Sequence, residues 1–588
     1  MRPKTPGLSE TADKGFSRRD LMTKAAAASV VGMGLKHQEP ATDNAITTAD
    51  LAVVDKVAGR SYAEKDRVLM ARSLGRIREQ LKTIREFDLD ASTEPATHFD
   101  PLLPGMSVPV GPPHFTLSRS SIPAYDGNPE SLAFASAVEL SRLIKARKVT
   151  STALTCMYLG RLKKFGPRLN CVVTLTEDLA LKQAQRADRE IASGRYRGPL
   201  HGIPWGAKDL LATKGIRTTF GAKPYENQVL DYDSTVVARL EEAGAVLVAK
   251  LSMGELAMGD VWFGGVTRNP WRPTRGSSGS SAGPGSATAA GLVGFSIGTE
   301  TLGSIVSPSV ANGVTGLRPT YGRVSRHGAM ALVWTMDKIG PMCRAVEDCA
   351  LVLNAIYGPD GKDRTIADVP FSWEPNKPLG DLRIGIDTAA FDSIARNEDR
   401  KKIYDAVRSS LEILGVKLIP VKLPPQKPAY QGLPSFIIDV ESAASFQKLT
   451  ASGKLDDLVQ QGVGNWPNTF RIGSTIGAAD YLQALRIRTQ LQHEMAESMK
   501  DLDLFVTVPF SGPSLSMTNL TGHPTLVTRC GMNNGMPEMV EFTGNLYRED
   551  AILRVAHAFE RATDHHKLWP DTEKLPESPP PMEQRQRG

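Results

Sequence analysis

The chain has 588 residues, of which 41% are apolar and 23% charged, and this composition is typical of folded globular proteins. Its formal net charge is +6, but part of the basic excess lies in the first 40 residues and no long block of lysine and arginine follows, which argues against nucleic-acid binding. The five cysteines are scattered and lack the cysteine or histidine spacing of a zinc site, so we expect them to be buried core thiols.

Residues 1–40 have the layout of an export signal. Arg18 and Arg19 precede a short, weakly apolar run from Ala25 to Leu35. This run is about half of the roughly 20 residues that span a bilayer, so we expect a twin-arginine-type signal peptide rather than a transmembrane helix. Such a protein uses the twin-arginine translocon during export and is periplasmic or secreted. The alternative is a disordered basic terminus.

Residues 41–130 are predicted to form a helical extension followed by a linker. Between residues 48 and 87 apolar residues recur at helical spacing among many charges, which predicts one or two amphipathic helices. Residues 88–130 contain many prolines and are expected to be extended.

Residues 131–570 are predicted to form the catalytic domain. A helical pattern begins at residue 131, and helices then alternate with short β-branched runs such as 245–250 and 382–386. This alternation predicts an α/β fold whose central mixed β-sheet is covered by helices on both faces. Residues 571–588 are polar and rich in proline, so we expect a disordered tail.

A stretch from Thr274 to Pro308 begins like a flexible serine and glycine linker and then becomes small and apolar. Within it, Gly279 to Gly283 formally matches G-x-S-x-G, the nucleophile elbow of α/β-hydrolases, with Ser281 as the nucleophile of a serine esterase. The elbow needs a strand directly before it and a helix directly after it. A loop rich in proline and arginine precedes this match and Gly-Pro-Gly follows it, so the esterase interpretation is only an alternative.

A lysine upstream offers a second chemistry. In "GPLHGIPWGAKDL", Lys208 follows six uncharged residues, 202–207. A lysine in such a setting loses hydration, and desolvation lowers its pKa, so that a neutral amine becomes available to accept a proton. A serine hydroxyl needs such a base because it is a weak nucleophile on its own.

Taken together, these segments resemble the amidase signature family of serine hydrolases. The resemblance extends from about residue 132 to 562 and includes the lysine segment, "NPWRPTRGSSGSSAG", "GTETLGSIVSP", "GVTGLRPTYGRVSRHG" and "NLTGHPTL". It implies that Ser304 is the nucleophile, that Ser280 bridges in a cis peptide after Gly279, and that Lys208 is the base. The implied reaction is hydrolysis of a carboxylic amide to an acid and ammonia or an amine, through an acyl-enzyme and without a metal or organic cofactor.

The resemblance also places an oxyanion hole in the loop before the nucleophile. The backbone N–H groups of Thr301, Leu302 and Gly303 could hold the developing oxyanion. Ser281 either hydrogen-bonds the proton relay and helps bind substrate or caps the loop.

The chain departs from the family pattern at several positions. The family usually has glycine where Ser278, Ala282 and Leu302 stand, aspartate where Glu300 stands, and often arginine where Val306 stands. A positive φ at Leu302 would strain that residue and reshape the oxyanion loop. A family fold that has lost its chemistry and binds a ligand is therefore an alternative function.

The expected partner is a small-molecule amide, whose identity the sequence does not give. The family also includes the glutamine-hydrolysing component of a tRNA amidotransferase, which the export signal disfavours. The oligomeric state is left open, with a homodimer as one option.

Overall fold

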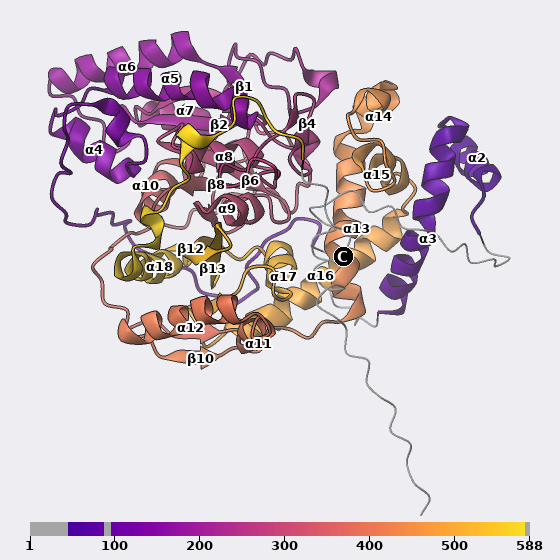
Figure 1. Ribbon diagram of the computed structural model, residues 1–588. Coiled ribbons are helices and arrows are strands. Elements are labelled where there is room, and N and C mark those ends of the chain that lie inside the picture. Colours follow the sequence, from indigo (N-terminus) through magenta and orange to yellow (C-terminus); the bar gives the residue numbers. More distant parts are fainter. Residues whose placement is uncertain (1–44, 88–95, 583–588) are drawn as a thin grey trace, which may run out of the picture.

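The computed structural model describes residues 45–87 and 96–582 (Figure 1). The expected signal peptide, residues 1–40, lies outside these ranges. The described chain contains a mixed sheet of eleven strands in the order β1-β3-β2-β6-β8-β7-β12-β13-β11-β9-β10, with helices covering both faces. The predicted α/β fold is therefore confirmed. A separate hairpin consists of β4 (Val261–Trp262) and β5 (Gly265–Val266).

The strands of the sheet are short, and those at its centre are completely buried. They are β1 (Val172–Leu175), β2 (Pro204–Lys208), β3 (Val246–Leu251), β6 (Phe295–Glu300), β7 (Thr315–Arg318), β8 (Lys338–Cys343), β9 (Ile384–Ile386), β10 (Leu418–Pro420), β11 (Leu504–Thr507), β12 (Thr525–Asn533) and β13 (Met536–Gly544). The expected strands at 245–250 and 382–386 correspond to β3 and β9. Strand β2 pairs in parallel with both β3 and β6, so these strands end at the same edge of the sheet.

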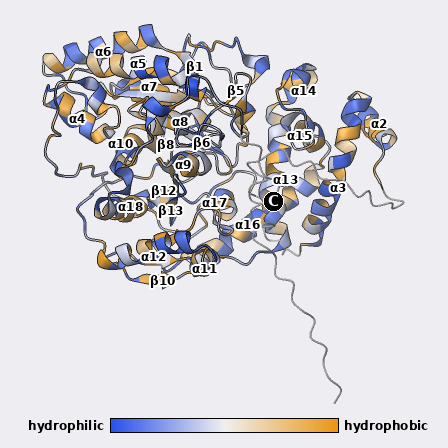
Figure 2. Ribbon diagram, in the orientation of Figure 1, coloured by the Kyte–Doolittle hydropathy of each residue, from blue (hydrophilic) through white to orange (hydrophobic). Residues whose placement is uncertain are grey.

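The helices of the catalytic body pack on this sheet and on one another. They are α4 (Ala137–Lys145), α5 (Ser151–Leu169), α6 (Glu177–Ala192), α7 (Thr235–Glu242), α8 (Ala282–Ala289), α9 (Val306–Asn312), α10 (Val346–Ile356), α11 (Thr388–Ser393), α12 (Glu398–Ile413), α17 (Ser514–Thr521) and α18 (Glu549–Thr563). Figure 2 shows hydrophilic and hydrophobic residues alternating along outer helices such as α6 and α12, as expected for helices with one face in water. Within the described ranges, none of the helices combines the length and the apolar character needed to cross a membrane.

A second group of helices stands beside the sheet (Figure 1). It contains α13 (Pro428–Ser445), α14 (Gln447–Ala451), α15 (Trp466–Gly473) and α16 (Ala478–Met499), against which the N-terminal helices α2 (Thr48–Val57) and α3 (Glu64–Glu86) pack. The two amphipathic helices expected between residues 48 and 87 are thus present. Met70, Leu74 and Ile77 lie on one face of α3 at helical spacing and pack with Leu51 and Ile472.

The described part of the proline-rich segment, residues 96–128, runs over the body largely as an extended chain, as its composition predicts. Phe99 is 3% exposed and packs edge-on against Tyr321, with the ring centroids 4.9 Å apart. The Arg488 guanidinium lies over the same phenyl ring. This segment therefore brings an aromatic side chain from the N-terminal region into the catalytic body.

The C-terminal segment differs from the expected disordered tail over its described part, which ends at residue 582. Thr572–Lys574 form a 3-10 turn, and Leu575 is buried. Arg161 donates to Thr572 Oγ1 at 3.2 Å and Arg168 donates to the Leu575 carbonyl at 3.1 Å, both from α5. The composition predicted disorder because it gives no information on long-range contacts. In the structure, one buried leucine and two hydrogen bonds hold this segment on the body.

Candidate active site

Lys208 is the last residue of β2 and is completely buried. Its Nζ lies 2.9 Å from Ser280 Oγ, 3.0 Å from Ser281 Oγ and 2.8 Å from Thr299 Oγ1. The Thr299 carbonyl oxygen is a fourth neighbour at 3.3 Å. All four neighbours of the amine are uncharged oxygens.

This environment disfavours the charged form of the lysine. Burial lowers the pKa of Lys208 to about 7, although the carboxylates of Asp337 and Glu300 act in the opposite direction. No carboxylate is within ion-pair distance of the Lys208 amine in the described part of the chain. A neutral amine is therefore available near neutral pH, as the uncharged sequence before Lys208 predicted.

Ser280 and Ser281 come from the glycine-rich loop that precedes α8. The Gly279–Ser280 peptide bond is cis, as the family resemblance implied. The Ser280 carbonyl accepts from Gly254 N at 3.2 Å. Ser281 Oγ accepts from Thr299 N at 3.1 Å and donates to the Thr299 carbonyl at 3.1 Å. With its proton already used, the Ser281 hydroxyl can only accept from Lys208.

Ser304 lies in the loop between β6 and α9. It is 8% exposed, whereas Ser280 is 1% exposed and Ser281 is completely buried. The Ser304 carbonyl accepts from Ser281 N at 3.2 Å, which joins the two serine loops. Among the described residues, Ser304 Oγ makes no hydrogen bond. The structure therefore brings Lys208 and Ser280 into direct contact and links Ser304 to them through the backbone.

The loop before Ser304 presents a row of free donors. In the described part of the chain, the backbone N–H groups of Thr301, Leu302, Gly303 and Ser304 have no hydrogen-bond acceptor. Consecutive N–H groups that lack an acceptor are the type of donor that an oxyanion hole requires.

Glu300, at the end of β6, holds this loop in place. Its Oε2 accepts from the backbone N–H groups of Ile305 and Val306 at 2.8 and 2.9 Å. Its Oε1 accepts from Arg318 and from Asn519 Nδ2, both at 2.8 Å. Burial alone would raise the pKa of Glu300, but Arg318 and Lys338 lower it to about 2, so the carboxylate is ionised.

Two departures from the family pattern have clear structural outcomes. The positive φ of the 301–304 loop lies at Gly303, at +82°, and Leu302 has no positive φ. The strain considered for Leu302 therefore does not arise. Ser278 does have a positive φ, at +60°, and its N–H donates to Asp260 at 3.0 Å.

Of the two elements that the esterase elbow needs, only the helix after the nucleophile is present. Helix α8 begins at Ala282, directly after Ser281, with Gly283, Pro284 and Gly285 in its first turn, although this Gly-Pro-Gly sequence argued against a helix. In the described chain no strand lies directly before Ser281, and its hydroxyl is buried and fully hydrogen-bonded. This geometry gives Ser281 no access to a substrate.

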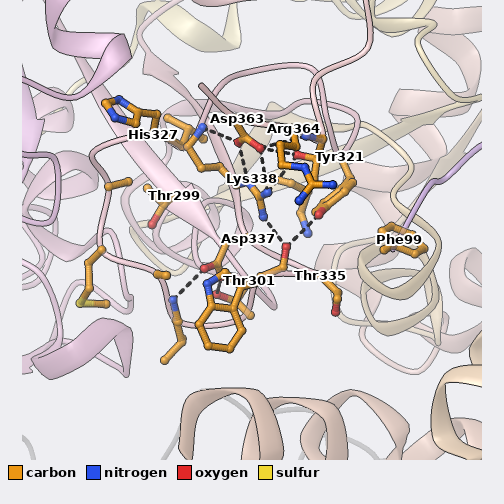
Figure 3. A pocket seen from close by; sticks show the side chains of 18 of the residues that line it. Phe99, Thr299, Thr301, Tyr321, His327, Thr335, Asp337, Lys338, Asp363 and Arg364 are labelled. Carbon is orange, nitrogen blue, oxygen red and sulfur yellow. Dashed lines mark hydrogen bonds and ion pairs between the residues drawn. The ribbon is translucent and has the colours of Figure 1, made fainter. Parts of the chain in front are cut away.

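A cavity of about 440 Å³ lies beside these residues. Thr299, which contacts Lys208, and Thr301, at the start of the 301–304 loop, are among its lining residues. Figure 3 shows Asp363 and Arg364 together on one side of the cavity and Thr301 with Asp337 on another. Phe99 of the N-terminal segment adds a further wall.

The local sequence patterns did not single out Thr299 or Asp337. Thr299 reaches the lysine because β6 pairs in parallel with β2, a relation that only the sheet order reveals. Asp337 accepts from Thr301 Oγ1 at 2.5 Å, beside the start of β8. No group of three or more His, Cys, Asp or Glu side chains suited to a metal ion occurs among the described residues.

The matches to known proteins decide the family. The model of the family named Amidase matches residues 153–553 of this chain. The chain belongs to the Amidase family. It is therefore an enzyme of a family that acts on amide C–N bonds, and the segments that suggested this all lie within the matched range.

Curated relatives are similar over most of this amidase. A glutamyl-tRNA(Gln) amidotransferase component from Heliobacterium modesticaldum is 35% identical over 479 residues, which are 74% of this chain and 98% of the relative. The protein of the same name from Roseiflexus is 35% identical over 72% of this chain and 95% of its own length. About a quarter of this chain has no counterpart in them.

Solved structures share the fold. The peptide amidase of Stenotrophomonas maltophilia matches with a TM-score of 0.67 and 29% identity, over 76% of this chain and 100% of that one. An amidase family protein from Bacillus anthracis matches with a TM-score of 0.67 and 26% identity, over 76% of this chain and 94% of that one.

Proposed function

We propose that this amidase hydrolyses a carboxylic amide to an acid and ammonia or an amine, with Ser304 as nucleophile, Ser280 as proton relay and Lys208 as base. The observation that carries the proposal is the completely buried Lys208 amine, 2.9 Å from Ser280 Oγ and without a carboxylate partner in the described part of the chain. Burial favours the neutral amine near pH 7, so it can accept a proton.

The contacts of Lys208 indicate which way its lone pair points. A neutral amine has two N–H groups and one lone pair. Ser281 Oγ can only accept a hydrogen bond from the amine. Thr299 offers two acceptors, its carbonyl oxygen and its hydroxyl oxygen. With both N–H groups directed to Ser281 and Thr299, the lone pair is left for the Ser280 hydroxyl.

The reaction then follows in two halves. Ser304 Oγ attacks the amide carbonyl while its proton passes to Ser280 and the Ser280 proton passes to Lys208. The N–H groups of the 301–304 loop stabilise the oxyanion, and one such donor is typically worth about 3 to 4 kcal/mol in the transition state. The C–N bond breaks as the proton passes from Lys208 through Ser280 to the leaving nitrogen of the substrate. Water repeats the sequence and releases the acid.

The direct test replaces the nucleophile. Ser304→Ala should lower kcat by at least roughly 10³-fold while the melting temperature is unchanged, because residual catalysis would come only from binding and the oxyanion loop. A fluorophosphonate probe should label wild type at Ser304. Labelling at Ser281 would favour the esterase, and no labelling would favour a ligand-binding protein that has lost its chemistry.

The curated relatives make glutamine the first amide to test. They are named as parts of an amidotransferase, whereas the structural relatives include a peptide amidase. Steady release of ammonia from glutamine by the isolated chain would favour the first role, and release from C-terminal peptide amides the second. Neither result changes the assignment of the triad.

We also propose export through the twin-arginine translocon, supported by Arg18, Arg19 and the short apolar run after them. Replacement of both arginines by lysine should retain the protein in the cytoplasm. Equal amounts of wild type and variant in the cytoplasmic fraction would contradict export.

A further inference from the structure

The cavity beside the triad has the size of a small-molecule site. Its volume of about 440 Å³ lies near the lower end of the range of roughly 300 to 1,000 Å³ for ligand pockets. Phe99, Tyr321 and Trp334 contribute aromatic surface to its walls, and Leu332 and Met330 contribute aliphatic surface. An amide built on one aromatic ring fits this space.

The two carboxylates that line the cavity are occupied by the protein itself. Asp337 Oδ1 accepts from Thr301 Oγ1, and its Oδ2 accepts from Leu332 N and Val333 N at 2.8 and 2.9 Å. Asp363 accepts two bonds from the Arg326 side chain, at 2.9 and 3.1 Å, and so neutralises that guanidinium. The oxygens of both acids are therefore occupied by protein donors, and the charge of Asp363 is balanced by Arg326.

Three basic side chains of the cavity lack this compensation. Lys338 is 3% exposed and donates to the Met336 carbonyl, while Lys362 and Arg364 line the cavity from the segment that carries Asp363. Over the ranges that the structure describes, none of the three makes an ion pair with a carboxylate. Burial and the neighbouring Arg318 lower the pKa of Lys338 well below its usual range, so this amine offers an anionic group a hydrogen bond. The exposed Lys362 and Arg364 offer it positive charge.

From this arrangement we propose that the cavity binds the acyl part of the substrate and that this part carries a carboxylate away from the scissile amide. The inference rests on the proposed amide hydrolysis and adds the substrate class. Thr301 places the cavity at the reacting carbonyl, because it lines the cavity and also begins the row of free N–H groups. Arginine and lysine recognise a carboxylate through charge-assisted hydrogen bonds.

Three primary amides on one benzamide scaffold test the proposal: 4-carbamoylbenzoate, benzamide and 4-(aminomethyl)benzamide. They are anionic, neutral and cationic, and each releases ammonia that can be measured directly. We expect kcat/KM to be at least about tenfold higher for the anionic amide than for benzamide, and lowest for the cationic one. The preference should weaken as salt is raised, because Lys362 and Arg364 are in contact with solvent.

Lys362→Gln/Arg364→Gln should bring the three kcat/KM values together, mainly by raising KM for 4-carbamoylbenzoate. Lys417→Gln, which removes a lysine far along the chain on the α12–β10 connection, should leave the preference intact. Lys338→Met should also weaken the preference for 4-carbamoylbenzoate. Because Lys338 is buried, the melting temperature of this variant should be compared with that of the wild type.

The outcomes separate this inference from the proposed function. Equal kcat/KM for the three amides, a preference that survives the double variant, or hydrolysis of other amides only would overturn the anionic substrate class and leave the triad standing. Failure to hydrolyse any amide, glutamine and peptide amides included, would instead overturn the proposed function.

Discussion

Thr299 Oγ1 lies 2.8 Å from Lys208 Nζ, as close as the Ser280 hydroxyl that is 2.9 Å away. Thr299 and Lys208 sit on neighbouring parallel strands, β6 and β2, so the contact is set by the rigid centre of the sheet. The same threonine borders the cavity, and its backbone N–H and carbonyl fix the Ser281 hydroxyl. Thr299 is thus a positioning residue for the amine that we propose as the base.

Thr299→Val should lower kcat/KM by roughly 10- to 100-fold, because the amine loses an acceptor and is no longer held toward Ser280. The free energy of unfolding should change little, since valine has nearly the same shape. Thr299→Ser restores the hydroxyl and should recover most of the activity. Equal loss in the valine and serine variants would show that only side-chain packing matters at this position.

The pH dependence of the reaction should report the buried amine. Burial lowers the pKa of Lys208 to about 7, and the base is active only when neutral. We therefore expect kcat/KM to rise about tenfold per pH unit below 7 and to level off above it. A profile that is flat between pH 5 and 9, or that rises only near pH 10, would contradict Lys208 as the base.

Stability should respond to the same group in a predictable direction. The folded-state pKa of about 7 is below the ordinary lysine value of 10.5, so the folded protein binds fewer protons between these values and its stability rises with pH in this window. Lys208→Met removes that cost. Its gain in free energy of unfolding should be larger at pH 7 than at pH 9, as measured by urea denaturation.

Much of the site follows from local sequence. The uncharged run before Lys208 predicts a desolvated amine, and the glycines around Ser280 and Ser304 predict loops that bring backbone close to backbone. The helical spacing of Met70, Leu74 and Ile77 likewise predicts α3 and its buried face. These features depend on residues that are near one another in the chain.

Other parts depend on contacts between distant segments and were not predictable. Glu300 looked like a mere substitute for aspartate, yet it joins the nucleophile loop to Arg318 and to Asn519 of α17. Phe99 gave no sign of its place in the cavity wall, because it lies in a proline-rich segment outside the range of the family match. Sheet order and the path of the extended segment decide both.

Glu300→Gln should destabilise the protein and slow the reaction together. The amide can keep one contact to the loop but leaves the buried Arg318 guanidinium without its carboxylate partner 2.8 Å away. Breaking a buried ion pair in this way costs roughly 3 to 5 kcal/mol. Urea denaturation and kcat on the same samples measure the two effects.

A matched control for Glu300→Gln is Asp439→Asn, which removes a buried carboxylate 3.3 Å from Arg76, between α13 and α3. Its partner is half exposed, so the charge left behind is solvated and the loss should be much smaller, with kcat unchanged. A similar loss of kcat in both variants would mean that Glu300 acts only through global stability.

Phe99→Ala should enlarge the cavity at the wall that the N-terminal segment supplies. Phe99 is 3% exposed between Tyr321 and Arg488, and truncation of a buried phenylalanine costs roughly 3 to 5 kcal/mol. We expect KM for a one-ring amide to rise at least about tenfold and kcat/KM for bulkier amides to increase relative to that of the one-ring amide.

Phe87→Ala is the matched control, because Phe87 packs on Tyr430, with centroids 6.0 Å apart, and does not line this cavity. Both variants should lower the melting temperature, but only the first should change the order of preferred substrates. An unchanged order in Phe99→Ala would show that the segment stabilises the body without shaping the site.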